Sequence, residues 1–308
     1  MKKWIFAFIS LAFIGIVLLY ALVPSNIAIS ASTSVNTSPA AAIRVLSDDS
    51  AWIKWWPGTV DGSGLHFNGA SYILSKKMFQ SFSVDIATRQ SKTESLLVLL
   101  PLKRDSFEIE WKLSVGTGLN PIDRFRRSRE ANNKKKDLDQ LLTAFRKYVE
   151  DSKNIYGSKI IETHVQDSII LVSTIKTTAY PSPKLIYQEI SKLKKAAASA
   201  GAKETNKPML NVHQEGNLYM ARVGLPIGKE IAVEGSNLSI KRMVLGYILV
   251  SEIQGGPATV SRTMSMMELY MADNKRKSPA IPYESLVTDR SAESDSSKWI
   301  TRIYYPVY

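Results

Sequence analysis

Two residues of the sequence have side chains and surroundings suited to binding or acid–base chemistry. Glu284 lies in the apolar stretch IPYESLV, residues 281–287, and His213 lies in MLNVHQE, residues 209–215, each at the same distance from a preceding proline. Burial in apolar surroundings raises the pKa of a carboxyl group unless a cation or hydrogen bonds compensate. A carboxyl group and an imidazole that face one groove could act as base and acid.

Aromatic residues near Glu284 could complete a site for an organic cation. Trp299 and Tyr304 lie in KWITRIYYPV, and Tyr247 begins YILVSEI. Stacking of a ligand ammonium on such rings contributes about 0.5–2 kcal/mol, depending on desolvation. A structural alternative stays open, because Arg302 on the neighbouring predicted strand could pair with Glu284 without a ligand. The predicted ligand-binding residues are Glu284, Trp299, Tyr304, Tyr247 and His213.

Metal and cofactor chemistry has little support in the composition. The chain has no cysteine and three histidines, His66, His164 and His213. The lack of cysteine excludes disulfides, thiolate catalysis and cysteine-based zinc sites. The sequence also lacks Gly-x-Ser-x-Gly, a phosphate-binding glycine loop and His-Glu-x-x-His. We therefore predict no metal and no cofactor.

An internal repeat must position the candidate residues. IILVSTI, residues 169–175, matches YILVSEI, residues 247–253, at a spacing of 78 (247 − 169), and YMARVGLPI matches WITRIYYPV with Arg222 aligned to Arg302. A helix and two strands follow each first stretch. Two such units are expected to pair about a pseudo-twofold axis and leave a groove at their junction. The predicted helices are 182–201 and 258–274, and the predicted strands are 207–215, 218–227, 278–286 and 298–307.

The duplicated βαββ pattern, with its PAIPYESLVTD and KWITRIYYPV stretches, resembles the GyrI-like family of effector-binding domains. This resemblance covers residues 158–308 and implies binding of small organic molecules, frequently cationic amphiphiles, in the groove between the repeats. It also implies that Glu284 is the groove glutamate and that Trp299 and Tyr304 lie beside it. The aromatic residue of the family's Gly-Pro-aromatic turn is missing, because Ala258 follows Pro257.

Two other function classes stay open for this groove. Some proteins of this group resemble hydrolases, which would make Glu284 the general base and Tyr247 or Tyr304 its proton partner. A structural or partner-binding module without a ligand is the other class, and it predicts filled pockets in both domains. Transcriptional regulation is disfavoured, because no helix-turn-helix precedes the effector-like part of the chain.

The first half of the sequence indicates a curved antiparallel sheet closed by a long helix. Strands are predicted at 26–35, 71–75, 82–88, 94–102 and 107–115, and apolar residues at three- and four-residue steps predict a helix over 137–157. This order resembles the SRPBCC, or polyketide-cyclase-like, helix-grip superfamily over residues 25–157. The resemblance implies an apolar cavity, for which Trp52, Trp55 and Trp56 are candidate lining residues. Packing in the core is their alternative role.

The basic run DRFRRSREANNKKK, residues 123–136, precedes the predicted helix. Its charge could attract anionic lipid headgroups or nucleic acid, as could the net charge of +12. The aromatic platforms of single-strand binders are missing apart from Phe125. We predict a solvated loop and no nucleic-acid partner.

The N-terminal residues 4–23 contain no charge and are long enough, as a helix, to cross a bilayer. The positive-inside rule places Lys2 and Lys3 in the cytoplasm, so both domains are predicted on the non-cytoplasmic side. A cleaved signal peptide is the alternative. The complete prediction is an α+β protein with a membrane anchor (1–24), a helix-grip domain (25–157) and a duplicated βαββ domain (158–308). This protein would sense or sequester a small lipophilic or cationic ligand.

Overall fold

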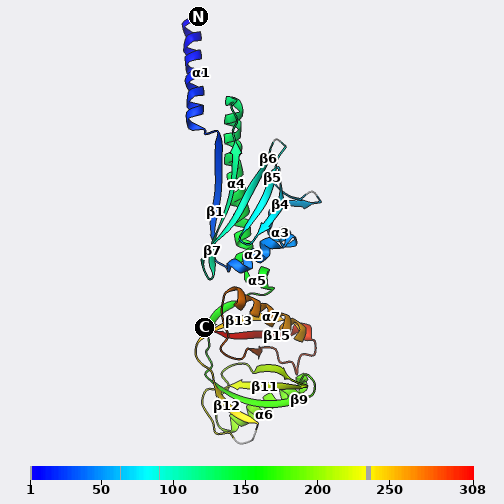
Figure 1. Ribbon diagram of the computed structural model, residues 1–308. Helices are drawn as coiled ribbons and strands as arrows, with labels where there is room; N and C mark the ends of the chain where they lie inside the picture. The colour runs from blue at the N-terminus through cyan, green and yellow to red at the C-terminus, as the bar shows by residue number, and fades with distance from the viewer. Residues whose placement is uncertain (1, 63, 90, 234–236) are drawn as a thin grey trace. The chain divides into compact units, whose positions relative to one another are not determined.

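The computed structural model describes residues 2–62, 64–89, 91–233 and 237–308, and these form two compact units that divide between Asp151 and Ser152 (Figure 1). Each unit contains an antiparallel sheet and helices, so the protein is α+β with two antiparallel sheets.

The sheet of the first unit has seven strands in the order β1-β7-β6-β5-β4-β3-β2. Residues at alternate positions of these strands are buried, for example Phe107, Ile109 and Trp111 in β7, which is the pattern of a sheet with one covered face. The strands are β1 (Asn26–Val35), β2 (Thr59–Asp61), β3 (Gly64–Phe67), β4 (Ala70–Met78), β5 (Ser81–Ala87), β6 (Lys92–Lys103) and β7 (Ser106–Gly116).

Helix α4 (Pro121–Glu150) lies along this sheet and packs on β1 and β7 (Figure 1). Asn120 caps its first turn by accepting a hydrogen bond from the Ile122 N–H at 2.9 Å, and Pro121 occupies the first helical position. The basic run 123–136 is therefore helical. The sequence predicted a loop there, because the apolar stripe of the helix begins only at Leu138.

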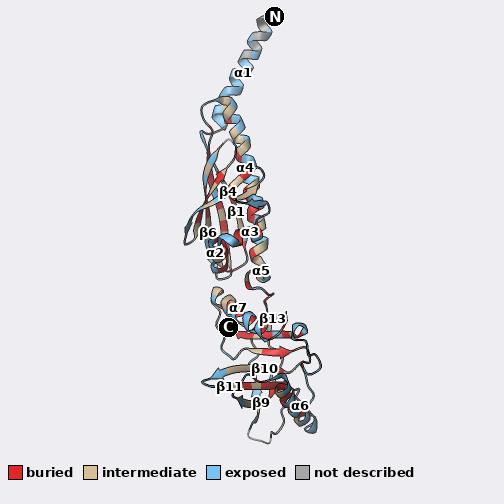
Figure 2. Cartoon of the chain, turned by 90° about the vertical axis from the view of Figure 1, so that its right-hand side faces the viewer, coloured by how far each residue is buried: buried red, intermediate tan, exposed pale blue. Residues whose placement is uncertain are grey.

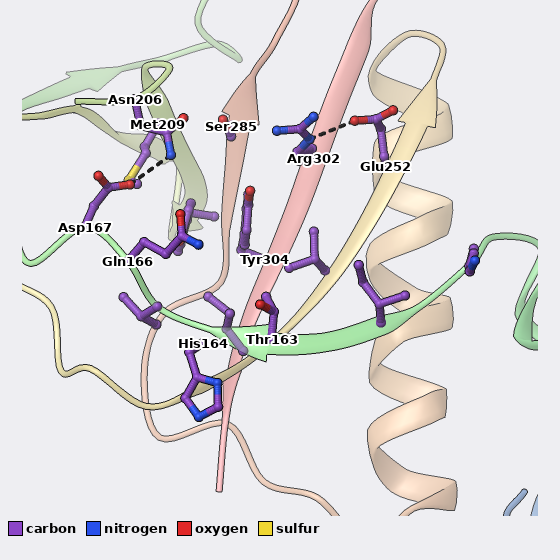
Figure 3. Close-up of a pocket in the computed structure, with 16 residues that line it drawn as sticks. Thr163, His164, Gln166, Asp167, Asn206, Met209, Glu252, Ser285, Arg302 and Tyr304 are labelled. Carbon is purple, nitrogen blue, oxygen red and sulfur yellow. Dashed lines mark hydrogen bonds and ion pairs between the residues drawn. The ribbon is translucent and has the colours of Figure 1, made fainter. Parts of the chain in front are cut away.

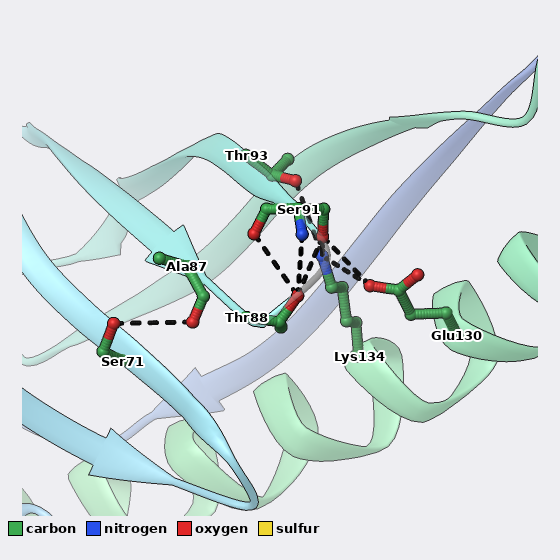
Figure 4. Close-up of polar contacts among 7 residues, drawn as sticks. All are labelled: Ser71, Ala87, Thr88, Ser91, Thr93, Glu130 and Lys134. Carbon is green, nitrogen blue, oxygen red and sulfur yellow. Dashed lines mark hydrogen bonds and ion pairs between the residues drawn. The ribbon is translucent and has the colours of Figure 1, made fainter.

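Lys134, in the basic run, is buried and connects α4 to the turn between β5 and β6 (Figure 4). Its ammonium lies 3.4 Å from Glu130 and 3.5 Å from both Ser91 and Thr93. Ser91 also donates to Glu130 at 3.1 Å. These contacts give the buried ammonium of Lys134 hydrogen-bond partners and an ion pair inside the unit. Lys134 therefore has a structural role, in which it joins α4 to the sheet.

The two short helices α2 (Pro39–Ser47) and α3 (Asp49–Trp55) bring the tryptophan cluster into the core. Trp52, Trp55 and Trp56 are buried, with neighbouring ring centroids 5.0–6.3 Å apart. Trp55 also packs edge-on against Phe145 of α4, and Trp56 against Tyr72 of β4. These rings fill space between helices and sheet, and a ligand-lining role for them stays a prediction.

Helix α1 (Lys2–Leu22) precedes β1, and its described side chains are mostly exposed (Figure 2). Crossing the hydrocarbon core takes about 20 consecutive apolar residues in a helix. Among the residues that the structure describes, no helix is both long enough and apolar enough for this. The predicted membrane-spanning helix at residues 4–23 is therefore corrected, and so is the predicted single-pass placement of both domains on the non-cytoplasmic side.

The sheet of the second unit has eight strands in the order β12-β9-β11-β10-β14-β15-β13-β8. Helix α6 (Pro183–Ser199) packs on β9 and β11, and α7 (Pro257–Asp273) packs on β13 and β15, while the short α5 (Ser152–Tyr156) contacts α7. The strands are β8 (Ile161–His164), β9 (Ile169–Thr177), β10 (Met209–Glu215), β11 (Leu218–Pro226), β12 (Leu238–Arg242), β13 (Tyr247–Gln254), β14 (Tyr283–Leu286) and β15 (Ile300–Val307).

The second unit consists of two copies of one strand–helix–strand–strand element. We call β9-α6-β10-β11 the first copy and β13-α7-β14-β15 the second copy. The two copies join where β10 pairs with β14, through Met209 opposite Ser285 and Leu210 opposite Glu284. Alternate residues of each strand point to opposite faces. One face of the sheet is covered by the helices, and the other is called the open face below.

Strand register shows which residues of the copies correspond. Arg222 lies opposite Thr174 and Asn211, and Arg302 lies opposite Glu252 and Ser285. With Arg222 matched to Arg302, the corresponding residues of the open face are Ile170 and Ile248, Val172 and Val250, Thr174 and Glu252, Met209 and Tyr283, Asn211 and Ser285, and Gly224 and Tyr304.

Candidate functional site

Glu284 is buried on the helix-covered face and is already paired with a cation of the chain. Its carboxylate accepts a hydrogen bond from Arg290 Nη2 at 3.1 Å, and the same nitrogen donates to Thr301 Oγ1 at 2.8 Å. The guanidinium lies over the Trp299 ring, 4.9 Å from its centroid. Arg290 thus occupies the position predicted for a ligand cation between Glu284 and an aromatic ring.

The predicted alternative partner of Glu284, Arg302, lies on the other face of the sheet. Arg302 Nε instead donates to Glu252 Oε2 at 2.7 Å. Burial raises the pKa of Glu284, and the neighbouring Arg290 acts in the opposite direction. Glu284 therefore has an ion-pair partner within the chain, but it is Arg290, a loop residue that no repeat or strand pattern indicated, and not Arg302.

His213 and Glu284 do not share a groove. Leu210 lies opposite Glu284 across the junction, so Leu210 and Glu284 face the helices, whereas His213 lies three positions further along β10 on the open face. His213 Nε2 lies 2.8 Å from Glu215 Oε1. The register makes Leu210, and not His213, the counterpart of Glu284, so the structure does not assemble the predicted acid–base pair.

The two tyrosines predicted near Glu284 are also separated from it. Tyr304 points to the open face, where its ring stacks on Tyr283 with centroids 4.9 Å apart and planes inclined by 11°. Tyr247 is exposed and packs against His164, with centroids 4.4 Å apart. The hydrolase arrangement of Glu284 with Tyr247 or Tyr304 is therefore not present in this geometry.

The open face carries a pocket of about 800 Å³ over the first copy, which we call the first-copy pocket. Its floor is the apolar cluster of Ile170, Val172 and Met209, against which Met243 and Tyr283 pack. Gly224 is closely packed in this floor, because a Cβ atom there would lie 2.9 Å from Ile170 Cγ2. Its walls include residues 279–282, just before β14, residues 306–308, and Met243, Val244 and Gly246, which precede β13.

The charged side chains of the first-copy pocket are all basic. They are Arg222, Lys241 and Arg242, and the lining residues that the structure describes include no aspartate or glutamate. Arg242 pairs with Glu230 at 2.6 Å outside the pocket. Arg222 is half-buried, and among the described residues its guanidinium donates a long hydrogen bond to Asn211 Oδ1 at 3.3 Å and lies 3.5 Å from His213 Nδ1.

The second copy carries a corresponding pocket of about 520 Å³ on the open face, the second-copy pocket (Figure 3). Here the arginine is neutralised, because Glu252 stands where the first copy has Thr174. Tyr304 fills the place of Gly224, and Thr163 of β8 stands where β12 places Lys241, since these two lie opposite Ile248 and Ile170. The two pockets adjoin at Val165, Met209 and Tyr283.

Arg222 is a candidate site residue that sequence reasoning missed, although a signal for it was present. The paired stretches IILVSTI and YILVSEI differ at two positions only, and one of them exchanges Thr174 for Glu252. The arginines of the other paired stretch are identical. Pairing these two observations would have predicted one arginine with a carboxylate partner and one without.

Comparison with known proteins yields structural similarities at low sequence identity. No family model matches the chain, and no curated protein matches it. The C-terminal domain of EcmrR is 14% identical over 49% of this chain and 98% of that domain, with a TM-score of 0.41. A hydrolase from Listeria innocua is 9% identical over 48% of this chain and 91% of its own, with a TM-score of 0.37.

A third similar structure is that of SAV2435 bound to tetraphenylphosphonium. It is 15% identical over 49% of this chain and 94% of its own, with a TM-score of 0.31. All of these TM-scores are low, so function is inferred below from the residues of this chain alone. The predicted resemblance of the first unit to helix-grip proteins stays a prediction.

Proposed function

We propose that the second unit binds a small amphipathic organic anion in the first-copy pocket, which would let the protein sense or sequester such a molecule. The observation that carries this proposal is Arg222, a half-buried guanidinium that contacts no carboxylate among the described residues. A charge held away from bulk water gains most from a partner of opposite sign. A ligand carboxylate would supply that partner.

The rest of the pocket suits the apolar part of the same ligand. The floor of Ile170, Val172 and Met209 offers apolar contact area, and Met209, Met220 and Met243 bring flexible side chains that adapt to irregular ligand shapes. A volume of about 800 Å³ lies within the range of pockets for small organic ligands, roughly 300–1,000 Å³. Lys241 adds a second positive charge at the wall.

This proposal replaces the expected cationic ligand by an anionic one. The only cation beside Glu284 that the described residues show is Arg290, which belongs to the chain itself. A module that binds no ligand was predicted to have filled pockets, whereas the open face is hollowed over both copies. No specific contact among the described residues favours hydrolysis.

The experiment that tests the proposal is calorimetric titration of the full chain with three ligands of equal chain length: decanoate, decanol and decyltrimethylammonium. We expect decanoate to bind most tightly. The decisive variant is Thr174→Glu, which gives Arg222 the carboxylate that Arg302 has in Glu252, and it should weaken decanoate binding at least tenfold. Thr174→Gln is the matched control, because it adds the same bulk without the charge.

Three results would contradict the proposal. The first is decyltrimethylammonium binding as tightly as decanoate. The second is equal decanoate affinity in the Thr174→Glu and Thr174→Gln variants, since the added carboxylate would then have no effect on the site. The third is the absence of any heat of binding with decanoate under conditions where circular dichroism shows a folded protein.

A further inference from the structure

The second-copy pocket is built from different chemistry than its counterpart, although it occupies the corresponding place. Its residues converge from β8, β13, β14 and β15 and from the segments around Asp167 and Asn206 (Figure 3). Its buried floor includes Ile248, Val250 and Ser285. Polar side chains stand on two sides of this floor, so the pocket combines an apolar base with a hydrogen-bonding rim.

The charges around this pocket balance. Lys159 and Arg302 are the basic lining residues, and Asp167 and Glu252 are the acidic ones. Arg302 and Glu252 form an ion pair at 2.7 Å with both side chains about half exposed. Such an arrangement gives no net preference for an anion or a cation, so the ligand it suits is neutral.

An aromatic platform lies in the centre of the pocket. Tyr283 and Tyr304 stack face to face, and both line the pocket while remaining half-buried. The face of an aromatic ring carries partial negative charge, which attracts the weakly positive C–H groups on the flat side of a saturated ring. Tyr304 stands where the first copy has Gly224, so the platform is specific to the second copy.

The rim supplies both hydrogen-bond donors and acceptors. Asp167 accepts from Thr205 Oγ1 at 2.8 Å and from Asn206 Nδ2 at 3.0 Å, and each carboxylate oxygen has a second lone pair to offer. On the other side, Arg302 can donate and Glu252 can accept. A purely apolar ligand would displace the water bound to these groups and would offer no hydrogen bonds in its place.

We propose that the second-copy pocket binds the ring of a neutral sugar. The C–H face of the ring would stack on the tyrosine platform, and its hydroxyl groups would exchange hydrogen bonds with Asp167 and Asn206 on one side and with Glu252 and Arg302 on the other. This site is distinct in ligand chemistry from the first-copy pocket, and its existence does not depend on anion binding there.

Saturation-transfer NMR of the full chain tests the proposal with three probes at millimolar concentration: methyl β-D-glucoside, N-acetylglucosamine and cyclohexanol. At least one sugar should receive saturation, and cyclohexanol, which has the ring shape with a single hydroxyl, should receive less. Tyr304→Leu keeps an apolar side chain but removes the aromatic face, and it should weaken sugar binding about tenfold. Asp167→Asn should also weaken it.

Two control variants separate this site from its neighbour and from loss of folding. Arg222→Met should leave the sugar signal unchanged, and Tyr304→Leu should still bind decanoate if it is folded and the first-copy pocket works. The proposal is overturned if neither sugar receives saturation from the wild-type protein, or if cyclohexanol receives as much saturation as the sugars. It is also overturned if the Tyr304→Leu variant binds sugar with the same affinity as the wild type.

Discussion

The two copies of the second unit share their strand pattern and differ in how they treat the same arginine. In the first copy, Arg222 lies opposite Thr174 and faces a pocket whose described lining residues include no aspartate or glutamate. In the second copy, Arg302 lies opposite Glu252 and is paired with it. The fold accommodates an arginine at this position both with and without an ion-pair partner, so it requires neither arrangement. The difference between Arg222 and Arg302 therefore bears on which ligand each pocket can bind.

The copies differ on the helix-covered face as well, and there the difference concerns stability. Leu210 of the first copy packs in the apolar core under α6, whereas Glu284 in the corresponding place needs Arg290 as a partner. A buried ion pair seldom stabilises a protein more than apolar packing would, yet removing one partner is costly. The second copy thus depends on a charge that the first copy does without.

The largest effect is expected for Arg290→Leu, which leaves the Glu284 carboxylate buried without its cation. We expect the free energy of unfolding to fall by about 3–5 kcal/mol at neutral pH. Removal of Arg290 raises the pKa of Glu284 further. A raised pKa stabilises the folded state only below the ordinary value of 4.5, and this contribution is lost as the pH rises through the raised value.

Urea unfolding of Arg290→Leu between about pH 4 and pH 8 measures this dependence. The loss should be small at the acidic end and grow with pH. The double variant Glu284→Leu/Arg290→Leu reproduces the apolar residue of the first copy and should recover most of the stability. An equal loss at every pH would show that Arg290 stabilises the fold through packing alone.

The next largest effect distinguishes the two arginines. Arg222→Met should weaken decanoate binding by about tenfold to a hundredfold, because a hydrogen bond to a charged group contributes about 1.5–3 kcal/mol. Arg302→Met should leave decanoate binding nearly unchanged, since Glu252 already uses that charge. Calorimetry on the two variants side by side gives the comparison, and equal effects would remove the distinction between the copies.

Gly224→Ala should have a smaller effect that reports on the pocket floor. The new Cβ atom would lie 2.9 Å from Ile170 Cγ2 and 3.5 Å from Met209 Cβ, so the floor must shift. Overpacking of this kind costs about 1–3 kcal/mol in the free energy of unfolding, and it should also weaken decanoate binding. The control is Gly228→Ala, where the nearest atom lies at 3.6 Å.

The smallest effect on stability is expected for Glu252→Thr, which gives the second copy the residue of the first. The ion pair with Arg302 is about half exposed, so its loss should change the free energy of unfolding by about 1 kcal/mol or less. Tyr304 still fills the pocket, so this variant should gain no decanoate site. Glu252→Thr/Tyr304→Gly removes both differences, and calorimetry should then detect weak binding of a second decanoate.

Much of the second unit could be predicted from the sequence, because its two copies share a seven-residue stretch that differs at two positions only and the same order of helix and strand patterns. The match of IILVSTI to YILVSEI located both copies and their strand order. Pairing by spacing failed for His213 and Glu284, because turns of different length separate the strands in the two copies. A shift of one residue moves a side chain to the other face of a sheet. The strand register was therefore needed to identify Leu210 as the counterpart of Glu284.

The remaining errors have equally local causes. The start of α4 was missed because helix caps and charged residues, rather than an apolar stripe, form its first turns from Pro121 to Lys134. Arg290 lies in a turn, where sequence patterns carry no information about which buried group a side chain will reach. The predicted anchor relied on the uncharged run at residues 4–23, which the structure does not support as a span.

The edge strands bear on how the second unit folds. Strand β8 precedes the first copy in the chain but pairs with β13 of the second, and β12 precedes the second copy but pairs with β9 of the first. The strand that precedes each copy in the chain thus pairs with the other copy. Unfolding of either copy would therefore expose a strand edge of the other copy. We expect the second unit to unfold in one cooperative transition rather than as two independent modules.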